Sequence, residues 1–238
     1  MRFKSVSDYL AELPNQVLRE ALAGVIEGPD GDQIRIRSGI SPINSWVLYE
    51  TLVREQPGLV VEIGMGYGVS TVTILSALAE VGDGRLISID PYAGEFSARR
   101  PIALNLVAQA GLQERHRFEH RPSWQALPAL AEEGITPQLV YIDGCHDLDC
   151  VFVDTFLSDQ IIDTGGFMAF NDAGWPSVNR VLKELVRSQR YEELDTGVTR
   201  SYRGRNPLYS AARRLQSRSN EDRYFRKLAD RRPASAAL

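Results

Sequence analysis

The sequence VVEIGMGYGVST, residues 60–71, constrains the fold of this chain more than any other stretch. An apolar run from Leu59 to Ile63 ends in Gly64, Gly66 and Gly68, and a segment with helical spacing follows as far as Gly82. A strand, a glycine turn and a helix in this order let bare backbone and a helix N-terminus face a ligand. The stretch predicts a ligand-binding turn, and an ordinary glycine-rich turn is the alternative.

A second strand is predicted at residues 85–90, RLISID, where an apolar run stops on an acid. Asp90 lies 26 residues beyond Gly64. At the end of the second strand of a βαβ unit, a carboxylate can accept hydrogen bonds from both hydroxyls of a ribose. The pair of features predicts an adenosine-containing ligand. A dinucleotide fingerprint would have its third glycine where Val69 stands, which argues against NAD.

With Glu62 two residues before the first glycine, the stretch resembles motif I of the class I S-adenosylmethionine (SAM)-dependent methyltransferases. The resemblance implies that the glycines carry the methionyl and ribose part of SAM and that Glu62 contacts its methionine end. It further implies that Ser123 lies near the adenine and that Trp124 covers the adenine face, whereas a helix-capping serine and a core tryptophan are equally open. The predicted cofactor-binding residues are Glu62, Gly64, Gly66, Tyr67, Gly68, Ser70, Thr71, Asp90, Ser123 and Asp143.

Polar side chains also follow two later strands. An apolar run at residues 139–142 ends in Asp143, with His146 three residues on, and the strand at 166–170 ends in Asn171 and Asp172. Ligands of open α/β sheets bind beyond the carboxyl ends of the strands, so these groups should lie beside the glycine turn. Two carboxylates and an amide suit Mg²⁺ or a similar ion. The predicted metal ligands are Asp143, Asn171 and Asp172.

The segments YIDGCHDLDCVFVD and GGFMAFNDAGWPSV resemble one branch of the SAM-dependent O-methyltransferases. This branch includes sugar methyltransferases of the macrocin and mycinamicin type and the cephalosporin-biosynthesis methyltransferase. The resemblance implies that Asp143 and Asp172 hold Mg²⁺ and that His146 is the catalytic base. Asn171 stands where the sugar enzymes have an acidic residue. Catechol-type enzymes use a lysine base between these two strands, and this sequence has no lysine between residues 143 and 172. Two alternatives stay open: a cofactor-side Asp143 without metal, and Asp172 as a helix cap.

Charge and composition limit the partners. Residues 1–204 carry 18 basic and 28 acidic side chains, whereas residues 205–238 carry 9 and 3. Such an acidic body argues against a nucleic-acid substrate. The sequence has no apolar stretch of membrane-spanning length, no signal-peptide core at its N-terminus and only two cysteines. We therefore expect a cytoplasmic protein that does not associate with membranes.

The order of predicted elements gives a doubly wound α/β fold with a mostly parallel, Rossmann-like sheet. Helices at residues 7–27, capped by Ser7 and interrupted at Pro14, and at 44–55 form an N-terminal helical cap, residues 1–57. Residues 58–204 form the SAM-binding domain and end in antiparallel strands at 191–195 and 199–203. Residues 205–238 form a basic helical extension, one of whose helices carries Tyr224, Phe225 and Leu228. We expect this tail to dock on the acidic body or on a second subunit of a homo-oligomer.

The predicted function is magnesium-assisted O-methylation of a small-molecule hydroxyl, on a sugar or another natural product, with SAM as methyl donor. A non-catalytic SAM- or nucleotide-binding protein of the same fold is the first alternative. The presence of Asp143, His146 and Asp172 together argues against it, because binding SAM does not require all three. An NAD-dependent oxidoreductase is the second alternative. The acceptor is not named by fold or motif.

Overall fold

The computed structural model describes residues 2–36, 38–196 and 222–230, and the structural statements below concern these residues. Its helices are α1 (Val6–Glu12), α2 (Gln16–Leu22), α3 (Pro42–Glu55), α4 (Val69–Val81), α5 (Arg99–Gln109), α6 (Ser123–Glu132), α7 (Leu148–Ile161) and α8 (Pro176–Arg187). Its strands are β1 (Val25–Glu27), β2 (Gln33–Arg35), β3 (Leu59–Ile63), β4 (Arg85–Ile89), β5 (His116–Glu119), β6 (Leu139–Ile142), β7 (Phe167–Phe170), β8 (Tyr191–Glu193) and β9 (Arg223–Lys227). Short 3₁₀ helices lie at Gly94–Phe96 and Gln113–Arg115.

Seven strands form the central sheet, in the order β5-β4-β3-β6-β7-β9-β8. The strands from β5 to β7 are parallel, and β9 runs antiparallel to both β7 and β8. The chain leaves β3 toward β4 and β5 on one side and later returns to place β6 on the other. This reversal of strand order beside β3 is where open α/β sheets bind their ligands. The predicted doubly wound, mostly parallel α/β fold is confirmed.

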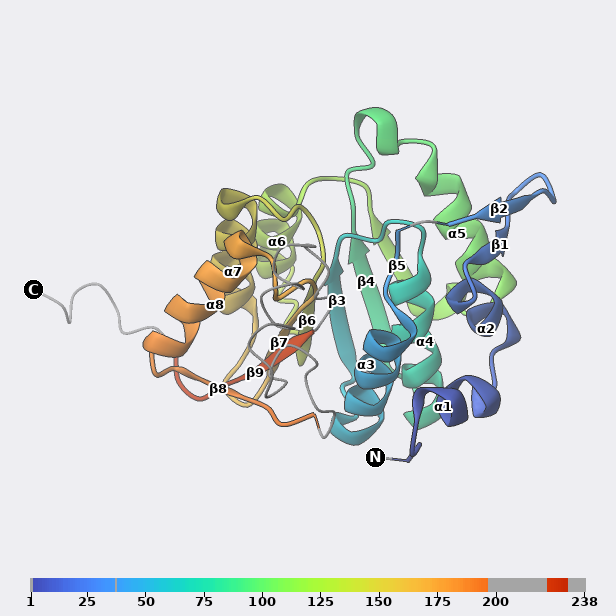
Figure 1. Cartoon of the computed structure of the whole chain (residues 1–238). Helices are drawn as coiled ribbons and strands as arrows, with labels where there is room; N and C mark the ends of the chain where they lie inside the picture. Colours follow the sequence, from blue (N-terminus) through green and yellow to red (C-terminus); the bar gives the residue numbers. More distant parts are fainter. Residues whose placement is uncertain (1, 37, 197–221, 231–238) are drawn as a thin grey trace, which may run out of the picture.

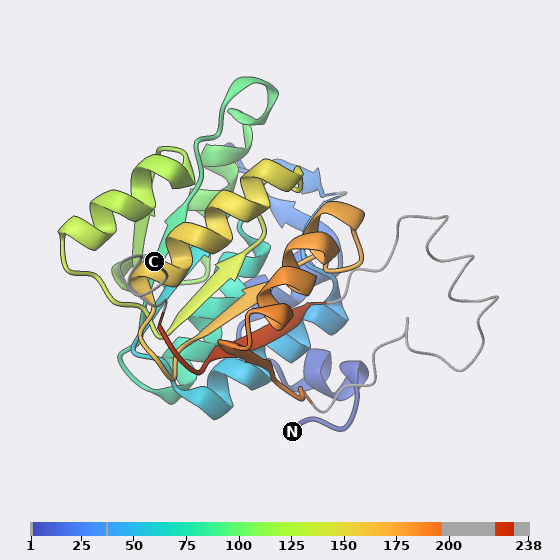
Figure 2. The same cartoon turned by 90° about the vertical axis from the view of Figure 1, so that its left-hand side faces the viewer.

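Helices cover both faces of this sheet, α1 to α5 on one side and α6 to α8 on the other (Figure 1). Figure 2 shows α6, α7 and α8 lying across their face. Alternate strand residues serve the two layers: Val60 packs toward α3 and α4, whereas Val61 belongs to the core beneath α6 to α8. Because both faces are covered, the central strands β3, β6 and β7 are largely apolar, which made them recognisable in the sequence. The edge strand β5, with the sequence HRFE, is only partly buried.

The N-terminal cap is packed onto the sheet domain through α3 and α4. The Tyr9 hydroxyl bonds to Ser45 Oγ at 2.8 Å, and Ser45 Oγ bonds to Thr73 Oγ1 at 3.0 Å. Pro14 separates α1 from α2, as predicted. The predicted cap residue is wrong, because Ser5 Oγ accepts the N–H of Asp8 and Ser7 lies inside the helix. Helix α2 ends at Leu22, before the predicted residue 27, and residues 25–35 form the antiparallel hairpin β1-β2.

The C-terminal strand corrects another prediction. Residues expected in a helix of the basic extension form β9, which lies between β7 and β8. Tyr224 and Phe225 are completely buried there, one on each face of the sheet. Arg223 pairs with Glu193 at 2.7 Å and Arg226 pairs with Glu55 at 2.7 Å, so this part of the basic segment does dock on the acidic body. The predicted strand at residues 199–203 and the first part of the predicted helical extension, residues 205–221, lie outside the described residues.

In the described part of the chain, none of the helices combines the length and apolar composition that a membrane span needs.

Candidate active site

The glycine turn joins β3 to α4 at the carboxyl edge of the sheet, and its first glycine is required by packing. Gly64 has φ +90°, and a Cβ there would lie 2.3 Å from the carbonyl oxygen of Asp143. Gly66 has φ +54° with open space where its Cβ would be, and Gly68 has φ +85°. Gly64 therefore lets the ends of β3 and β6 approach each other, whereas Gly66 leaves backbone open toward a ligand.

Asp90, at the end of β4, holds the glycine turn by hydrogen bonds. Its Oδ2 accepts the backbone N–H groups of Met65 at 3.0 Å and Gly66 at 3.1 Å, and its Oδ1 accepts that of Tyr92 at 2.8 Å. The Tyr92 hydroxyl in turn donates to the carbonyl of Gly66 at 2.8 Å. A carboxylate has about four acceptor positions, so these contacts leave capacity for a ribose hydroxyl. The predicted ribose contact stays a prediction.

Glu62 lies beneath the turn rather than on a cavity wall. It is completely buried, and its Oε2 accepts from Thr71 at 2.7 Å and from Ser88 at 2.6 Å, while Oε1 has no partner among the described residues. Burial raises the pKa of Glu62 to about 7, opposed by the hydroxyls of Ser70, Ser88 and Thr71. Contact of Glu62 with a methionine end stays a prediction.

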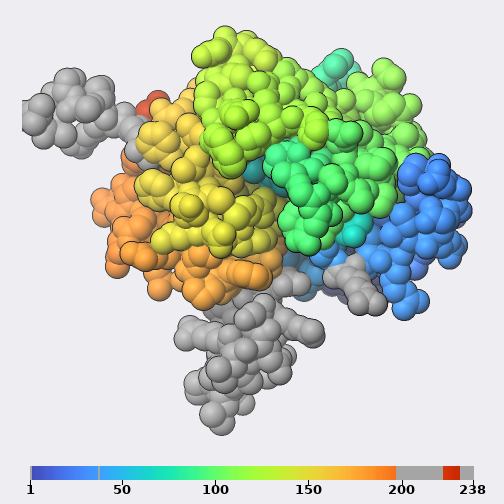
Figure 3. Space-filling model, turned by 90° about the horizontal axis from the view of Figure 1, so that it is seen from above, coloured from blue at the N-terminus to red at the C-terminus, as the bar shows by residue number. Residues whose placement is uncertain are grey.

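Two adjoining cavities open along the sheet edge, of about 460 and about 290 Å³. The larger one holds Asp90, Ser123 and Trp124, and the smaller one holds Tyr67, Ser70 and Asp172. The residues common to both walls are Gly64, Gly66, Arg99, Asp143, Gly144 and His146. Seen from above, the segment after β4, in green, lies next to the yellow start of α7 over this region (Figure 3). Of the predicted cofactor residues, Glu62, Gly68 and Thr71 do not line either cavity.

Ser123 and Trp124 are the predicted adenine contacts. Ser123 is the first residue of α6 and lines the larger cavity. Trp124 is 57% exposed on the same wall, so the alternative of a core-filling tryptophan is wrong. An exposed indole beside a cavity can cover an aromatic ring.

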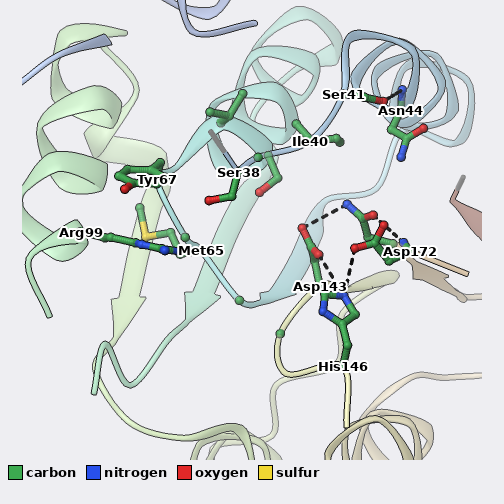
Figure 4. Close-up of a pocket in the computed structure, with 17 residues that line it drawn as sticks. Ser38, Ile40, Ser41, Asn44, Met65, Tyr67, Arg99, Asp143, His146 and Asp172 are labelled. Carbon is green, nitrogen blue, oxygen red and sulfur yellow. Dashed lines mark hydrogen bonds and ion pairs between the residues drawn. The ribbon is translucent and has the colours of Figure 1, made fainter. Parts of the chain in front are cut away.

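The groups that follow β6 and β7 converge on His146, as the sequence predicts. His146 Nε2 lies 3.7 Å from Asp143 Oδ1 and 3.5 Å from Asp172 Oδ2 (Figure 4). The Trp175 ring stacks on the imidazole, with centroids 5.2 Å apart, and Ser177 Oγ donates to the carbonyl of His146. The imidazole is therefore held at the wall between the two cavities, with a carboxylate on each side.

Burial dominates the electrostatics of this cluster. It raises the pKa of Asp143 well above its ordinary value, helped by the nearby charges of Asp222, Asp172 and Glu62 and opposed by the Asn171 amide. Burial also raises the pKa of Asp172, against the influence of His146. Crowded, partly desolvated carboxylates favour a proton or a cation between them.

A buried network behind the cluster was not predicted. The carboxylate of Asp222, just before β9, accepts from Asn44 at 3.0 Å, from the Tyr141 hydroxyl at 3.1 Å and from the Tyr224 hydroxyl at 3.2 Å. The side-chain amide of Asn171 joins this network to the His146 cluster. Its Nδ2 donates to the Tyr141 hydroxyl at 3.1 Å and to Asp143 Oδ2 at 3.2 Å. The carboxyl ends of β6 and β7 are thereby tied to β9 and α3.

The predicted metal ligands have suitable chemistry but not the arrangement of a prepared site. Asn171 turns its amide nitrogen toward Asp143, and its oxygen accepts the N–H of Asp172. His146 lies in the space between the two carboxylates. Among the described residues, His, Cys, Asp and Glu do not form a group of three placed to hold a metal ion. As arranged, these residues do not fit a metal.

The central part of the chain is similar to a known family of domains. Residues 61–173 match a methyltransferase domain. The match begins in β3 and ends just after β7, so it contains the glycine turn, Asp90 and the His146 cluster. No curated protein sequence matches the chain.

Solved structures share the fold of nearly the whole chain. One is the O-methyltransferase TomG from Streptomyces achromogenes, involved in tomaymycin synthesis and solved with SAM. It has 17% identity, a TM-score of 0.65 and coverage of 96% of this chain and 98% of that one. A putative O-methyltransferase from Klebsiella pneumoniae has 17% identity and a TM-score of 0.65, covering 94% and 96% of the two chains. An O-methyltransferase from Bacillus cereus, solved with SAH, has 14% identity and a TM-score of 0.61, covering 96% and 93%.

Proposed function

We propose that this chain is a SAM-dependent methyltransferase that methylates a hydroxyl group of a small molecule. The observation that carries the proposal is the position of His146. Its imidazole lies between two carboxylates on the wall that the cavities share, beside the Gly64 backbone. A base in this position can reach a hydroxyl in one cavity while the other holds the methyl donor.

The larger cavity suits the adenosine part of SAM. Asp90 offers a carboxylate oxygen at the ribose position, and Ser123 and Trp124 lie on the same wall. Gly66 presents bare backbone to both cavities. Solved relatives in fold that hold SAM or SAH support this choice of cofactor. Bound SAM would supply a methyl group on a sulfonium, which needs a nucleophilic oxygen in line with it.

His146 removes the proton from the acceptor hydroxyl as its oxygen bonds to the methyl carbon. Bound SAM would give up its methyl group to this oxygen, and its sulfur would remain as a neutral thioether. The proton stays on His146, where Asp143 and Asp172 at 3.7 and 3.5 Å stabilise the imidazolium. Trp175 restrains the ring by stacking on it. General-base catalysis of this kind contributes about 10²–10⁴-fold in rate.

The support for a magnesium ion is limited to the types of residue present at the site. Asp143, Asn171 and Asp172 carry oxygen atoms of the kind that Mg²⁺ prefers, but their present contacts leave no step that depends on it. Turnover should therefore survive removal of divalent ions by EDTA. A loss of turnover that added Mg²⁺ restores would support the magnesium site predicted from the sequence instead.

The narrower assignments are also proposals. They are membership of the macrocin, mycinamicin and cephalosporin branch, an acceptor from natural-product biosynthesis, a cytoplasmic location and a homo-oligomeric state. The similarity in fold to TomG supports an acceptor of natural-product type. Sedimentation of the purified protein tests the oligomeric state directly.

The test uses SAM carrying a labelled methyl group and a panel of small phenols, sugars and macrolide alcohols. Label should reach an acceptor oxygen, and His146→Ala should lower turnover by about 10²–10⁴-fold with little change in affinity for S-adenosylhomocysteine (SAH). Partial recovery at higher pH is expected, because hydroxide can replace the lost base. His120→Ala is the matched control, since His120 contacts Arg100 and not the cavities. Full activity of His146→Ala would refute the assigned base.

A further inference from the structure

Arg99, the first residue of α5, is a cation placed on the walls of both cavities. Among the described residues that line them, it is the one lysine or arginine. The acidic lining residues include Asp90, Asp143 and Asp172. No ion pair or side-chain hydrogen bond joins the Arg99 guanidinium to another residue of the described ranges. Elsewhere in the same ranges, Arg117 and Arg223 pair with glutamates.

Two aromatic rings hold the Arg99 side chain in place. Its Cζ lies over the ring of Tyr67, from the glycine turn, at 4.8 Å from the centroid. It also lies over the ring of Phe96, from the 3₁₀ helix after β4, at 4.4 Å. Cation–π contacts of this kind fix a guanidinium without giving its N–H donors an oxygen partner. The group is therefore positioned in advance but keeps its hydrogen-bonding capacity.

The distribution of charge around the smaller cavity indicates what kind of group the Arg99 guanidinium can bind. Arg99 and Tyr67 lie on one side, and Asp143, His146 and Asp172 lie on the other (Figure 4). A partly buried guanidinium facing a cavity gains most from a planar anion, which it can bind through two parallel hydrogen bonds. Among the described residues, no ion pair joins Arg99 to this acidic side, so an anionic group of a bound ligand can be its partner.

We propose that Arg99 is an anion-binding residue that pairs with a carboxylate or phosphate of a molecule bound in these cavities. The inference rests on the proposed function for the identity of that molecule. Two sources carry the required chemistry: the carboxylate of SAM itself, and an acidic group on the methyl acceptor. The two sources predict different behaviour of the same variant.

The first arm measures SAH and methylthioadenosine binding by calorimetry. SAH carries the carboxylate, whereas methylthioadenosine keeps the adenosine and the sulfur but lacks it. If Arg99 pairs with the cofactor, Arg99→Met should weaken SAH binding about tenfold or more and leave methylthioadenosine binding unchanged. Arg99→Lys should retain part of the affinity, because it keeps the charge but not the planar fork.

The second arm measures binding of benzoate and of inorganic phosphate, with and without saturating SAH. If Arg99 pairs with the acceptor, the SAH affinity of Arg99→Met should equal that of the wild type. Binding of benzoate or phosphate should then be lost in Arg99→Met. Arg100→Met is the matched control, because the neighbouring Arg100 is exposed, contacts His120 and does not line the cavities.

Equal binding of SAH, benzoate and phosphate by the wild type and Arg99→Met would overturn the proposal. Melting temperatures of each variant check that the fold is kept, and Arg99→Gln replaces Arg99→Met if the latter does not fold. Failure of the proposed function has a different signature, since the wild type would then bind no SAH. The benzoate and phosphate measurements without SAH would still decide the role of Arg99.

Discussion

Gly64 and Gly66 are glycines for different physical reasons, and a pair of substitutions separates them. Gly64→Ala puts a Cβ 2.3 Å from the Asp143 carbonyl oxygen, so the ends of β3 and β6 must move apart. We expect a loss of stability of about 3 kcal/mol, at the upper end of ordinary point substitutions. Gly66→Ala meets no atom and should cost about 1 kcal/mol, for its φ of +54°.

Gly66→Ala should affect ligand binding more than it affects stability. Gly66 lines both cavities, so an added Cβ would take up space that a ligand could use. Gly66→Ala should therefore weaken SAH binding about tenfold or more, equivalent to about 1.4 kcal/mol. Urea unfolding and calorimetry of the two variants provide the measurements. Unchanged SAH affinity in Gly66→Ala would mean that the turn does not carry the cofactor.

Glu62 should make stability depend on pH. Burial raises its pKa in the folded protein to about 7, above its usual value of 4.5. The folded state therefore binds the proton more tightly than the unfolded chain, and this contribution to stability is complete below about pH 4.5 and lost as pH rises to about 7. Glu62→Gln mimics the protonated form. The free energy of unfolding of the wild type, relative to Glu62→Gln, should fall across this window in chemical denaturation, whereas parallel curves would contradict it.

Individual site residues were predictable where they follow a recognisable strand. Asp143, His146 and Asp172 could be placed together because the carboxyl ends of parallel strands meet at one edge. Asp222 and Arg99 could not, since the contacts of each include residues distant in the sequence. Asp222 meets Asn44 and Tyr141, and Arg99 meets Tyr67. Nothing in their local sequence marks these partners.

At the scale of elements, β9 shows most clearly what pattern alone misses. Its sequence, RYFRK, surrounds two apolar residues with charges and does not read as a strand inside a sheet. Lys227 is nevertheless 3% exposed, because its Nζ donates to the carbonyls of Asp159 at 2.9 Å and Ile162 at 2.7 Å. Arg223 is paired with Glu193. These long-range partners satisfy the charges, so the strand can be buried.

The importance of β9 is tested by Phe225→Ala. Phe225 is completely buried beside Phe170, with ring centroids 5.9 Å apart. Removing a buried phenyl ring costs about 3–5 kcal/mol, which should appear as a lower midpoint of urea unfolding. Leu228→Ala, just beyond the strand and 46% exposed, is the control and should change stability little. Equal effects of the two substitutions would show that residues 223–227 do not form this strand.

Asp222 links this segment to the candidate active site. Asp222→Ala leaves the donors of Asn44, Tyr141 and Tyr224 without their carboxylate. We expect about 3 kcal/mol of destabilisation, since buried donors lose a charged acceptor. Tyr141→Phe removes one bond and should cost about 1 kcal/mol. Thermal unfolding compares them, and a neutral Asp222→Ala would contradict the network.

On the scale of the whole molecule, the candidate site lies where the strand order of the sheet reverses. The strand order reverses beside β3, and the glycine turn, Asp90 and His146 all lie at that edge. The position of these groups at one edge was predictable from the sequence. An apolar run that ends in glycine or an acidic residue indicates a strand and also shows where its carboxyl end lies. The hairpin β1-β2 and the C-terminal strand did not follow, because their stability comes from contacts with the rest of the fold.

The proposed methyl transfer requires that these cavities bind SAM. Calorimetric titration of the purified protein with SAH and, separately, with NAD tests it most directly. We predict saturable binding of one SAH per chain, no binding of NAD, and a loss of SAH affinity in Asp90→Ala of about tenfold or more, as expected for a hydrogen bond to a charged acceptor. Binding of NAD in place of SAH, or of neither, would show that these cavities are not a SAM site.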